Sequence, residues 1–400
     1  MKGLIIIFRP ADFLLPNVED LSRWAVIACD QFTSEPEYWH KVRDYAGSSP
    51  SAYNLVLPEA LLNDDNMQDI TRINSTMNDY LEHNIFTECR NSYIYVEREL
   101  LDGTTRRGLV GVIDLEQYDF RDGTTPKIRA TELTVTERIP PRKIIRENAQ
   151  IELSHVILLC DDEKHEIIEP LTLSKHDMKK LYDFTLMLGG GKIRGWRVHG
   201  DHARALNMRI DSYIKRKSKE LSLVFAVGDG NHSLAAAKSC YEEGKTSRYA
   251  MVELENIHDD ALKFEPIHRI VKNVSADDVI DDMRKAICTD ENTSWPVNYY
   301  AHNTKGTLYI DGTKGASALI VLQKYLDDKG FTIDYIHDTD SLIKLSDENN
   351  CVGFELPPFD DSAKREFFGV ISRSGVLPRK TFSMGHAQEK RYYLEARRIK

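Results

Sequence analysis

Apolar runs alternate with amphipathic stretches along this chain, and the change in spacing predicts an alternation of strands and helices. Short apolar runs rich in β-branched residues are typical of buried strands, whereas apolar residues three or four positions apart are typical of helices. The predicted strands lie at 3–8, 24–29, 92–97, 107–113, 155–160 and 248–255 and around Tyr309 and Leu319. The predicted helices begin near Pro36 and span 59–83, 175–188, 201–221 and 276–286. This mixture predicts an α/β fold, in the sense of a mixed α+β protein.

Residues 223–244 give the sharpest local prediction. A buried strand ends at Val227, and small or polar residues separate it from strong helix formers. We expect Asn231 or Ser233 to cap this helix and Gly244 to close it. Glycines let a ligand approach the main chain, and the N–H groups at a helix N-terminus favour phosphate. The residues expected to contact a phosphate here are Gly228, Gly230, Asn231 and Ser233.

Two side chains in this turn suggest chemistry beyond anion binding. A carboxylate beside a phosphate costs energy unless it holds a cation or takes a substrate proton, so we interpret Asp229 as a catalytic residue and a metal ligand. His232 can donate to an anion or move a proton near neutral pH. The alternative, given equal weight, is an ordinary junction in which both side chains bond local backbone. The turn is not a Walker loop, because the Gly-Lys-Ser/Thr ending is missing.

A second concentration of charge lies in the proline-containing segment 129–146. Arg129 and Arg142 could each form two hydrogen bonds to phosphate or carboxylate, and Glu132 could act as a base. The alternative is a pair of surface strands with ion pairs between them.

Two further motifs that contain histidine give weaker indications of a functional site than the two segments above. His268 and Arg269 follow a predicted strand. We expect the strand at 248–255 to lie beside the strand that ends at Val227, which would bring the two residues near the same crevice. A purely structural role is the alternative. The fragment from His199 to His202 has metal-ligand residue types, but no partner cluster at ligand spacing follows, so chance and helix capping explain it better.

Composition narrows the classes of protein and partner. The chain has 400 residues with a formal net charge of −10, enough for two to three domains and unfavourable for nonspecific nucleic-acid binding. The six cysteines form no CxxC pair, which predicts a reducing cytoplasm rather than disulfides or zinc. No apolar run is long enough to cross a bilayer. Basic residues near the C-terminus are interpreted as a solvated edge strand, with cover for an anionic ligand as the alternative.

Five segments in one order make the chain resemble the bacterial and archaeal family called domain of unknown function 1015. They are Asp229-Gly-Asn-His-Ser233, which we call the box; Glu265-Pro-Ile-His-Arg269; Arg129-Ala-Thr-Glu132 with 136–142; 334–337; and 377–394. The resemblance covers nearly the whole length and brings no settled activity.

Many members have Asp-Gly-His-His-Arg at the box, which looks like the phosphate-binding box of the ParB/sulfiredoxin-like superfamily, whose members include a free serine kinase. This resemblance implies that Asp229 assists an acceptor hydroxyl or its metal. It also implies that residues 230–233 cradle phosphates and that Glu132 is a second carboxylate. Two departures, Asn231 for histidine and Ser233 for arginine, weaken a nucleotide site, and Arg129 or Arg142 could supply the missing charge.

The leading hypothesis is a cytoplasmic phosphotransferase that uses ATP or ADP and Mg²⁺ to modify a small hydroxylated metabolite, with free serine as the first acceptor to test. The rival is a non-catalytic protein that binds a nucleotide or metabolite and regulates a partner. DNA binding and a metal hydrolase using His199 and His202 rank below both. The expected partner is a small molecule rather than nucleic acid or a membrane, and a homodimer is left open. The predicted domains are 1–125, 126–272, which carries the box, and 273–400.

Overall fold

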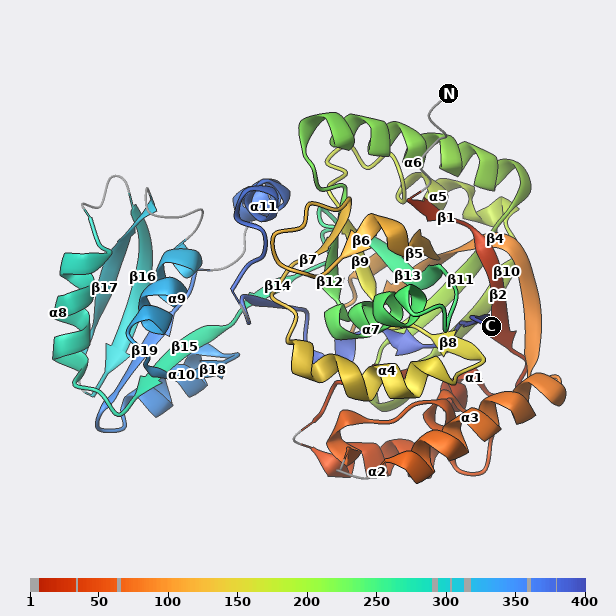
Figure 1. Ribbon diagram of the computed structural model, residues 1–400, viewed down its shortest axis with the longest axis horizontal. Coiled ribbons are helices and arrows are strands. Elements are labelled where there is room, and N and C mark those ends of the chain that lie inside the picture. The colour runs from red at the N-terminus through yellow and green to blue at the C-terminus, as the bar shows by residue number, and fades with distance from the viewer. Residues whose placement is uncertain are drawn as a thin grey trace. The chain divides into compact units, whose positions relative to one another are not determined.

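The chain folds into two compact units. The computed structural model describes residues 7–33, 35–62, 66–289, 294–302, 304–312, 318–357, 361–378 and 380–400. Unit 1 consists of residues 1–262 and 385–400, and unit 2 of residues 263–384 (Figure 1). This division differs from the three consecutive domains predicted from the sequence. The last sixteen residues return to unit 1, and a pattern of local elements does not reveal such a return.

Unit 1 is built on a mixed sheet that contains thirteen strands among the described residues. Its main path runs β6-β7-β12-β9-β13-β5-β4-β2-β22-β8, with β1 beside β5 and the pair β10–β11 beside β4. Its strands are β1 (Phe8–Arg9), β2 (Ala11–Pro16), β4 (Phe86–Glu99), β5 (Thr105–Asp114), β6 (Tyr118–Asp119), β7 (Ile128–Ala130), β8 (Ile151–Leu153), β9 (Ile157–Cys160), β10 (Lys180–Thr185), β11 (Lys192–Val198), β12 (Phe225–Asp229), β13 (Tyr249–Asn256) and β22 (Ala396–Arg398). A separate small sheet pairs β3 (Val26–Ile27) with β21 (Tyr392–Tyr393).

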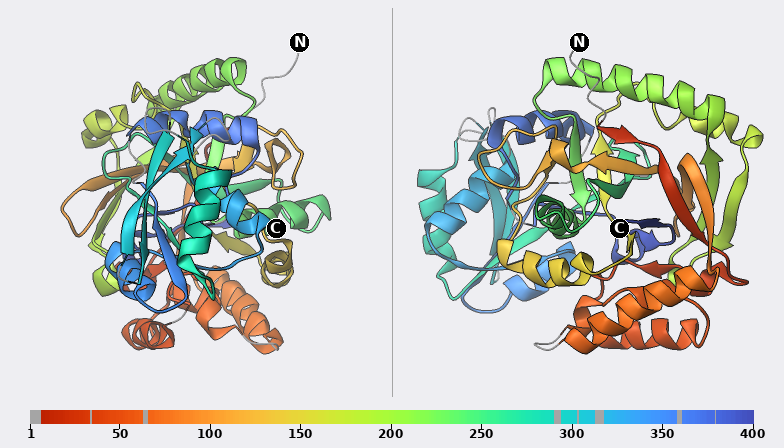
Figure 2. Two further views of the ribbon diagram at one scale, coloured as in Figure 1. Left: turned by 90° about the vertical axis from the view of Figure 1, so that its left-hand side faces the viewer. Right: turned by 45° about the vertical axis from the view of Figure 1, so that its right-hand side comes forward.

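Both faces of this sheet are covered by apolar cores. Successive side chains of a strand point to opposite sides, so each strand contributes to both cores. On β4, Tyr93 and Tyr95 enter one apolar core, while Ile94 and Val96 enter the other. Helix α6 packs on the first face, and α2 and α3 pack on the second (Figure 2). The helices of unit 1 are α1 (Leu21–Trp24), α2 (Pro36–Ala46), α3 (Met67–Glu82), α4 (Ile139–Glu147), α5 (Pro170–Ser174), α6 (Gly200–Glu220) and α7 (Asn231–Glu242). Short 3-10 turns include η1 (Ala52–Leu55), η2 (Glu59–Leu61) and η4 (Thr136–Arg138).

Unit 2 contains a smaller sheet in the order β17-β16-β19-β15-β18. On β15, Val271 joins the core formed with α8 and α9, while Ile270 packs with α10 on the opposite face. The elements of this unit are β14 (Phe264–Pro266), β15 (His268–Lys272), α8 (Ala276–Ala286), β16 (Ser294–Ala301), β17 (Thr304–Asp311), α9 (Ala318–Asp328), β18 (Thr332–Ile336), α10 (Thr339–Ser346), β19 (Cys351–Glu355), α11 (Asp361–Ser374) and β20 (Phe382–Met384).

Most predicted elements are confirmed, and two were wrong. The segment predicted as a helix at 175–188 contains strand β10, whose pairing with β11 overrides a weak helical pattern. The strand predicted around Leu319 is helix α9, which is buried along most of its length. A continuous apolar run does not distinguish a buried strand from a buried helix. Of the strand predicted at 3–8, residues 3–6 lie outside the described residues.

The sheet order corrects two further predictions. Strand β13 does not lie beside the box strand β12, because β9 lies between them and pairs with both. The basic C-terminal segment is not a solvated edge strand, because Arg391, Tyr392 and Tyr393 are buried and β22 lies between β2 and β8. Long-range pairing of this kind depends on the whole sheet rather than on local sequence. Within the described ranges, no helix is both long and apolar enough to cross a membrane.

Candidate functional site

The box adopts the predicted strand–turn–helix conformation. Strand β12 runs parallel to β7 and antiparallel to β9, and its register with β9 shifts between Val227 and Asp229, around Gly228. Gly230 then takes a left-handed conformation, with φ of 81°, and α7 begins at the next residue. The expected cap was wrong: Gly230 itself is the N-cap, and no side chain caps the helix. The first N–H groups of α7 are therefore not satisfied by an N-cap side chain. At the other end, Gly244 follows the C-cap in a left-handed conformation, as predicted.

Two oxygen atoms in the box lack hydrogen bonds among the described residues. Asp229 accepts a bond from the N–H of Gly230 through Oδ1, at 3.0 Å, but its buried Oδ2 has no hydrogen-bond partner there. Its nearest cation is Lys390, with Nζ 3.7 Å from Oδ2. The buried Oδ1 of Asn231 is likewise without a hydrogen bond. Such oxygen atoms are costly to bury unless something else binds them.

One ring nitrogen of His232 bonds the backbone, and the predicted catalytic role of this residue stays a prediction. The N–H of Val135 donates to Nε2 of His232 at 3.2 Å, so this nitrogen acts as an acceptor and is not available to move a proton. The hydroxyl of Thr131 donates to the carbonyl of Val227 at 2.8 Å. Together these bonds fasten segment 131–135, which carries the half-buried Glu132, against the box. The ring of His232 therefore positions this segment.

A cluster that the sequence did not single out lies beside the box. Nδ1 of His155 is 2.9 Å from the hydroxyl of Tyr393, and its Nε2 is 3.8 Å from Oδ2 of Asp30. The hydroxyl of Tyr393 also donates to Sγ of Cys29 at 3.0 Å. A Cβ atom added to Gly230 would lie 3.4 Å from Cδ2 of His155. The box and this Asp30–His155–Tyr393 cluster therefore adjoin, and we treat them as one candidate site.

Electrostatics connect the two carboxylates of the site. Burial opposes ionisation of Asp30, but positive neighbours and a hydrogen bond from Gln31 outweigh it and hold the pKa of Asp30 below its ordinary value. These neighbours are His155, Lys390 and Arg142. Lys390 therefore acts on Asp30 as well as on Asp229. By contrast, burial raises the pKa of the Cys29 thiol to about 11, so this thiol is neutral near pH 7 and a poor nucleophile.

The two predicted arginines lie on different elements, β7 and α4. Arg129 is a buried residue of β7, where burial lowers its pKa, and it pairs in register with Ala226 of the box strand. Arg142 lies on α4 and forms an ion pair with Glu59. The proline segment thus forms a helix, with Pro140 and Pro141 in its first turn, rather than the strand pair considered as an alternative.

His268 and Arg269 belong to unit 2, whereas the box and the Asp30–His155–Tyr393 cluster belong to unit 1. Both are buried on β15. The N–H of Leu356 donates to Nδ1 of His268 at 3.1 Å, and Nε of Arg269 donates to Gln323 at 2.7 Å. These bonds support the structural alternative. The sequence suggested otherwise because the two residues follow the strand at 248–255 closely. That strand ends in unit 1, and unit 2 begins at residue 263.

Metal-ligand residue types also come together away from the box. Asp161, Glu163 and His258 have potential ligand atoms within 4.8 Å of one another. Asp161 already accepts a bond from Lys217 at 2.7 Å and lies 2.7 Å from Nε2 of His258, so much of its charge is compensated. Neither His199 nor His202 is part of this group.

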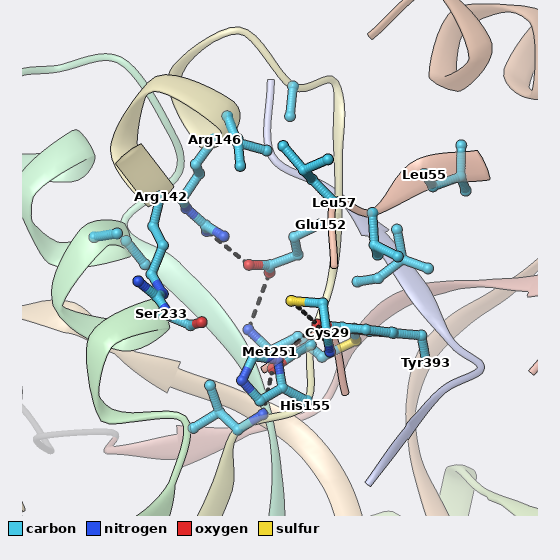
Figure 3. A pocket seen from close by; sticks show the side chains of 18 of the residues that line it. Cys29, Leu55, Leu57, Arg142, Arg146, Glu152, His155, Ser233, Met251 and Tyr393 are labelled. Carbon is cyan, nitrogen blue, oxygen red and sulfur yellow. Dashed lines mark hydrogen bonds and ion pairs between the residues drawn. The ribbon is translucent and has the colours of Figure 1, made fainter. Parts of the chain in front are cut away.

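A cavity of about 150 Å³ opens beside the first turn of α7 (Figure 3). Ser233 of the box lines it, together with Cys29, His155 and Tyr393 of the neighbouring cluster. The rest of its wall is largely aliphatic. The cavity therefore extends the candidate site away from the carboxylates.

The model of the family described as "Protein of unknown function (DUF1015)" matches residues 8–397, and the chain belongs to this family. No curated protein matches the chain.

Three similar solved structures show low identity. A conserved hypothetical protein from Pyrococcus furiosus has 12% identity and a TM-score of 0.33, covering 71% of this chain and 90% of that chain. A free serine kinase in complex with AMP has 12% identity and a TM-score of 0.36, covering 72% and 90%. SbnI with a C-terminal truncation, from Staphylococcus aureus, has 11% identity and a TM-score of 0.36, covering 68% and 81%. Likenesses at these TM-scores carry no argument about this chain, and the relation to the ParB/sulfiredoxin-like superfamily stays a prediction.

Proposed function

We propose that this site transfers a phosphoryl group from a nucleotide to a small hydroxylated metabolite. The observation that carries the proposal is Lys390, whose ammonium group lies near Asp229 and also lowers the pKa of Asp30, beside a helix start that no side chain caps. Phosphoryl transfer requires mainly positioning and positive charge around the phosphoryl oxygens. A lysine, a helix N-terminus and two carboxylates are a suitable set of groups for this task.

The nucleotide phosphates would bind the first N–H groups of α7, with Lys390 moving from Asp229 toward them. Oδ2 of Asp229 and Oδ1 of Asn231 fit Mg²⁺, because both are buried oxygen atoms without hydrogen bonds among the described residues. When bound, Mg²⁺ would neutralise charge on the phosphate oxygens. Asp229 thus keeps its predicted role as a metal ligand, and His232 holds segment 131–135 in place.

Asp30 would receive the proton of the acceptor hydroxyl. The acceptor oxygen forms a bond to the terminal phosphorus, the bond from that phosphorus to the bridging oxygen breaks, and the nucleoside diphosphate leaves with the electron pair. A carboxylate with a lowered pKa is ionised at neutral pH but accepts a proton weakly. The carboxylate can still take the proton, because the hydroxyl becomes more acidic as its oxygen bonds to phosphorus, and it also orients that hydroxyl. Asp30 replaces Glu132 as the proposed second carboxylate.

Nucleotide binding and turnover test the proposal separately. Millimolar ADP with Mg²⁺ should raise the melting temperature, and ³¹P NMR should detect transfer from ATP to an acceptor, with free serine as the first one tried. Asp229→Asn should weaken binding at fixed Mg²⁺, whereas Asp30→Asn should keep binding and lower kcat by about 10²-fold or more. Asp44→Asn, a change at an exposed residue of α2, is the matched control.

If no adenine nucleotide shifts the melting temperature, the proposal is wrong. Binding with no transfer to any acceptor would instead favour the second candidate, a nucleotide-binding regulatory protein. One observation favours this regulatory protein. The N–H of Val135 donates to Nε2 of His232, so this nitrogen is engaged and does not accept a proton from a substrate.

A further inference from the structure

The cavity beside the box is bounded mainly by apolar side chains from several elements of unit 1. Helix α7 contributes Ala236 and Ala237, and α4 contributes Ile145. Other apolar lining residues are Leu55, Leu57, Met77, Ile151, Val156 and Met251. Leu55, Leu57 and Met251 are labelled in Figure 3. Such a lining favours an apolar occupant.

The charged residues in the wall are already compensated within the protein. Glu152 accepts hydrogen bonds from Arg146 at 2.6 Å, from Arg397 at 2.7 Å and from the N–H of Met251 at 3.0 Å. Arg142 forms an ion pair with Glu59. A charged ligand would have to compete with these partners, so the cavity is unsuited to a second phosphate or a carboxylate.

The polar end of the cavity coincides with the candidate site. Ser233 lines this end of the cavity and belongs to the first turn of α7. His155 and Tyr393 line the same end and connect to Asp30. A ligand with one hydroxyl and an apolar body could therefore place its hydroxyl near Asp30 and its body in the cavity.

We infer that this cavity is the subsite for the apolar body of the phosphoryl acceptor, and that the acceptor is a small alcohol with about six to eight carbon atoms. The inference rests on the proposed function. A cavity of about 150 Å³ holds a molecule the size of benzene. Each methylene group buried there strengthens binding roughly fourfold. Free serine would leave the apolar wall unused. The transfer is the one described above: the alcohol proton goes to Asp30, and the nucleoside diphosphate leaves.

Benzyl alcohol is the probe, with ethanol and L-serine for comparison, and binding is measured by ligand-observed NMR on the full chain. Wild-type protein should bind benzyl alcohol at least tenfold more tightly than either comparison molecule. Ala236→Leu should weaken that binding at least tenfold, because the larger side chain fills the cavity, while the ADP-induced shift in melting temperature stays the same. Ile145→Phe, at a partly buried residue of α4, fills the cavity from another side if the first variant does not fold. Ala286→Leu, at an exposed position in α8, is the matched control.

Equal binding of benzyl alcohol and ethanol, or undiminished binding to a folded cavity-filling variant, would overturn the inference while leaving the ADP result intact. If ADP does not raise the melting temperature, the proposed function is wrong. Binding of benzyl alcohol would then show a cavity for an apolar ligand but not an acceptor site. Transfer to benzyl alcohol with a lower KM than transfer to serine would support both proposals.

Discussion

At the scale of single residues, Lys390 links the two carboxylates of the candidate site. It lies 3.7 Å from Asp229, and its charge helps to hold the pKa of Asp30 below the ordinary value. Its side chain is only 11% exposed, so water screens these interactions less than at an open surface. Lys390 therefore brings positive charge to both carboxylates of the candidate site.

Replacing Lys390 with Gln should shift the acid limb of the pH–rate profile to higher pH. The positive charge lowers the pKa of Asp30, so its removal raises that pKa, and the base form of Asp30 then appears only at higher pH. The measurement is kcat/KM for nucleotide-dependent transfer between pH 4 and 8, and Lys390→Arg, which keeps the charge, should restore the profile. An unshifted acid limb in a folded Lys390→Gln protein would exclude this role.

At the scale of elements, the turn between β12 and α7 depends on Gly230. Its φ of 81° is a conformation that residues with a side chain rarely adopt. A Cβ atom there would also lie 2.9 Å from Cγ2 and 3.0 Å from Cα of Val156. The start of α7 therefore needs both a left-handed residue and the absence of a side chain.

Gly230→Ala should destabilise the protein more than Gly244→Ala. Both positions have positive φ, but a Cβ atom at Gly244 would meet nothing within 4 Å. The comparison separates backbone strain, on the order of 1 kcal/mol at both sites, from the additional clash at Gly230. Urea denaturation gives the two free energies of unfolding. An equal loss of unfolding free energy in the two variants would mean that Val156 moves away from the new Cβ atom at no energetic cost.

At the scale of the whole molecule, unit 1 buries ionisable groups whose protonation affects its stability. Glu255 is fully buried, with Nε of Arg106 at 3.1 Å from its Oε1. Burial raises the pKa of Glu255 to about 8, with Glu253 adding to the effect. The folded chain therefore keeps a proton on this group that the unfolded chain releases near pH 4.5.

The free energy of unfolding should consequently fall as the pH rises from about 4.5 to about 8. In this interval the unfolded chain has lost the proton of Glu255 while the folded chain still holds it, so each rise in pH favours the unfolded chain. Glu255→Gln cannot ionise, so it should flatten this decline. Chemical denaturation at several pH values measures the slope, with the exposed Glu243→Gln as the control. An unchanged slope would mean that Glu255 is ionised throughout.

Removal of residues 385–400 should prevent unit 1 from folding cooperatively. The segment supplies β22 between β2 and β8, and the carbonyl of Leu394 accepts a bond from Trp24 Nε1 at 3.0 Å. Its Arg391 lies 2.6 Å from Glu253, and loss of one partner of a buried ion pair costs about 3–5 kcal/mol. Circular dichroism during a thermal melt measures the effect, and deletion of the exposed Lys400 alone should leave the melt unchanged. A cooperative melt of the truncated chain would contradict this expectation.

Local sequence patterns were enough to predict those helices whose ends are marked by capping residues or glycines. Helix α8 was predicted with its observed bounds, and α7 was predicted from the glycines before and after it. The prediction for β10 failed because its pairing with β11 decides the conformation there. Part of the candidate site was also invisible, because Asp30 and His155 lie far apart in sequence and carry no motif of their own. Lys390 lies in a segment that carries the family resemblance, but its place beside Asp229 could not be predicted.

The order of residues by itself determined where the box lies, that a strand enters it and a helix leaves it, and that glycines lie in the turn between them. These features follow from interactions among neighbouring residues. Only the tertiary structure decided that His232 accepts a backbone bond, that Lys390 reaches Asp229, and that an apolar cavity adjoins Ser233. Those outcomes depend on strands that pair across hundreds of residues, because the packed sheet fixes which distant side chains meet.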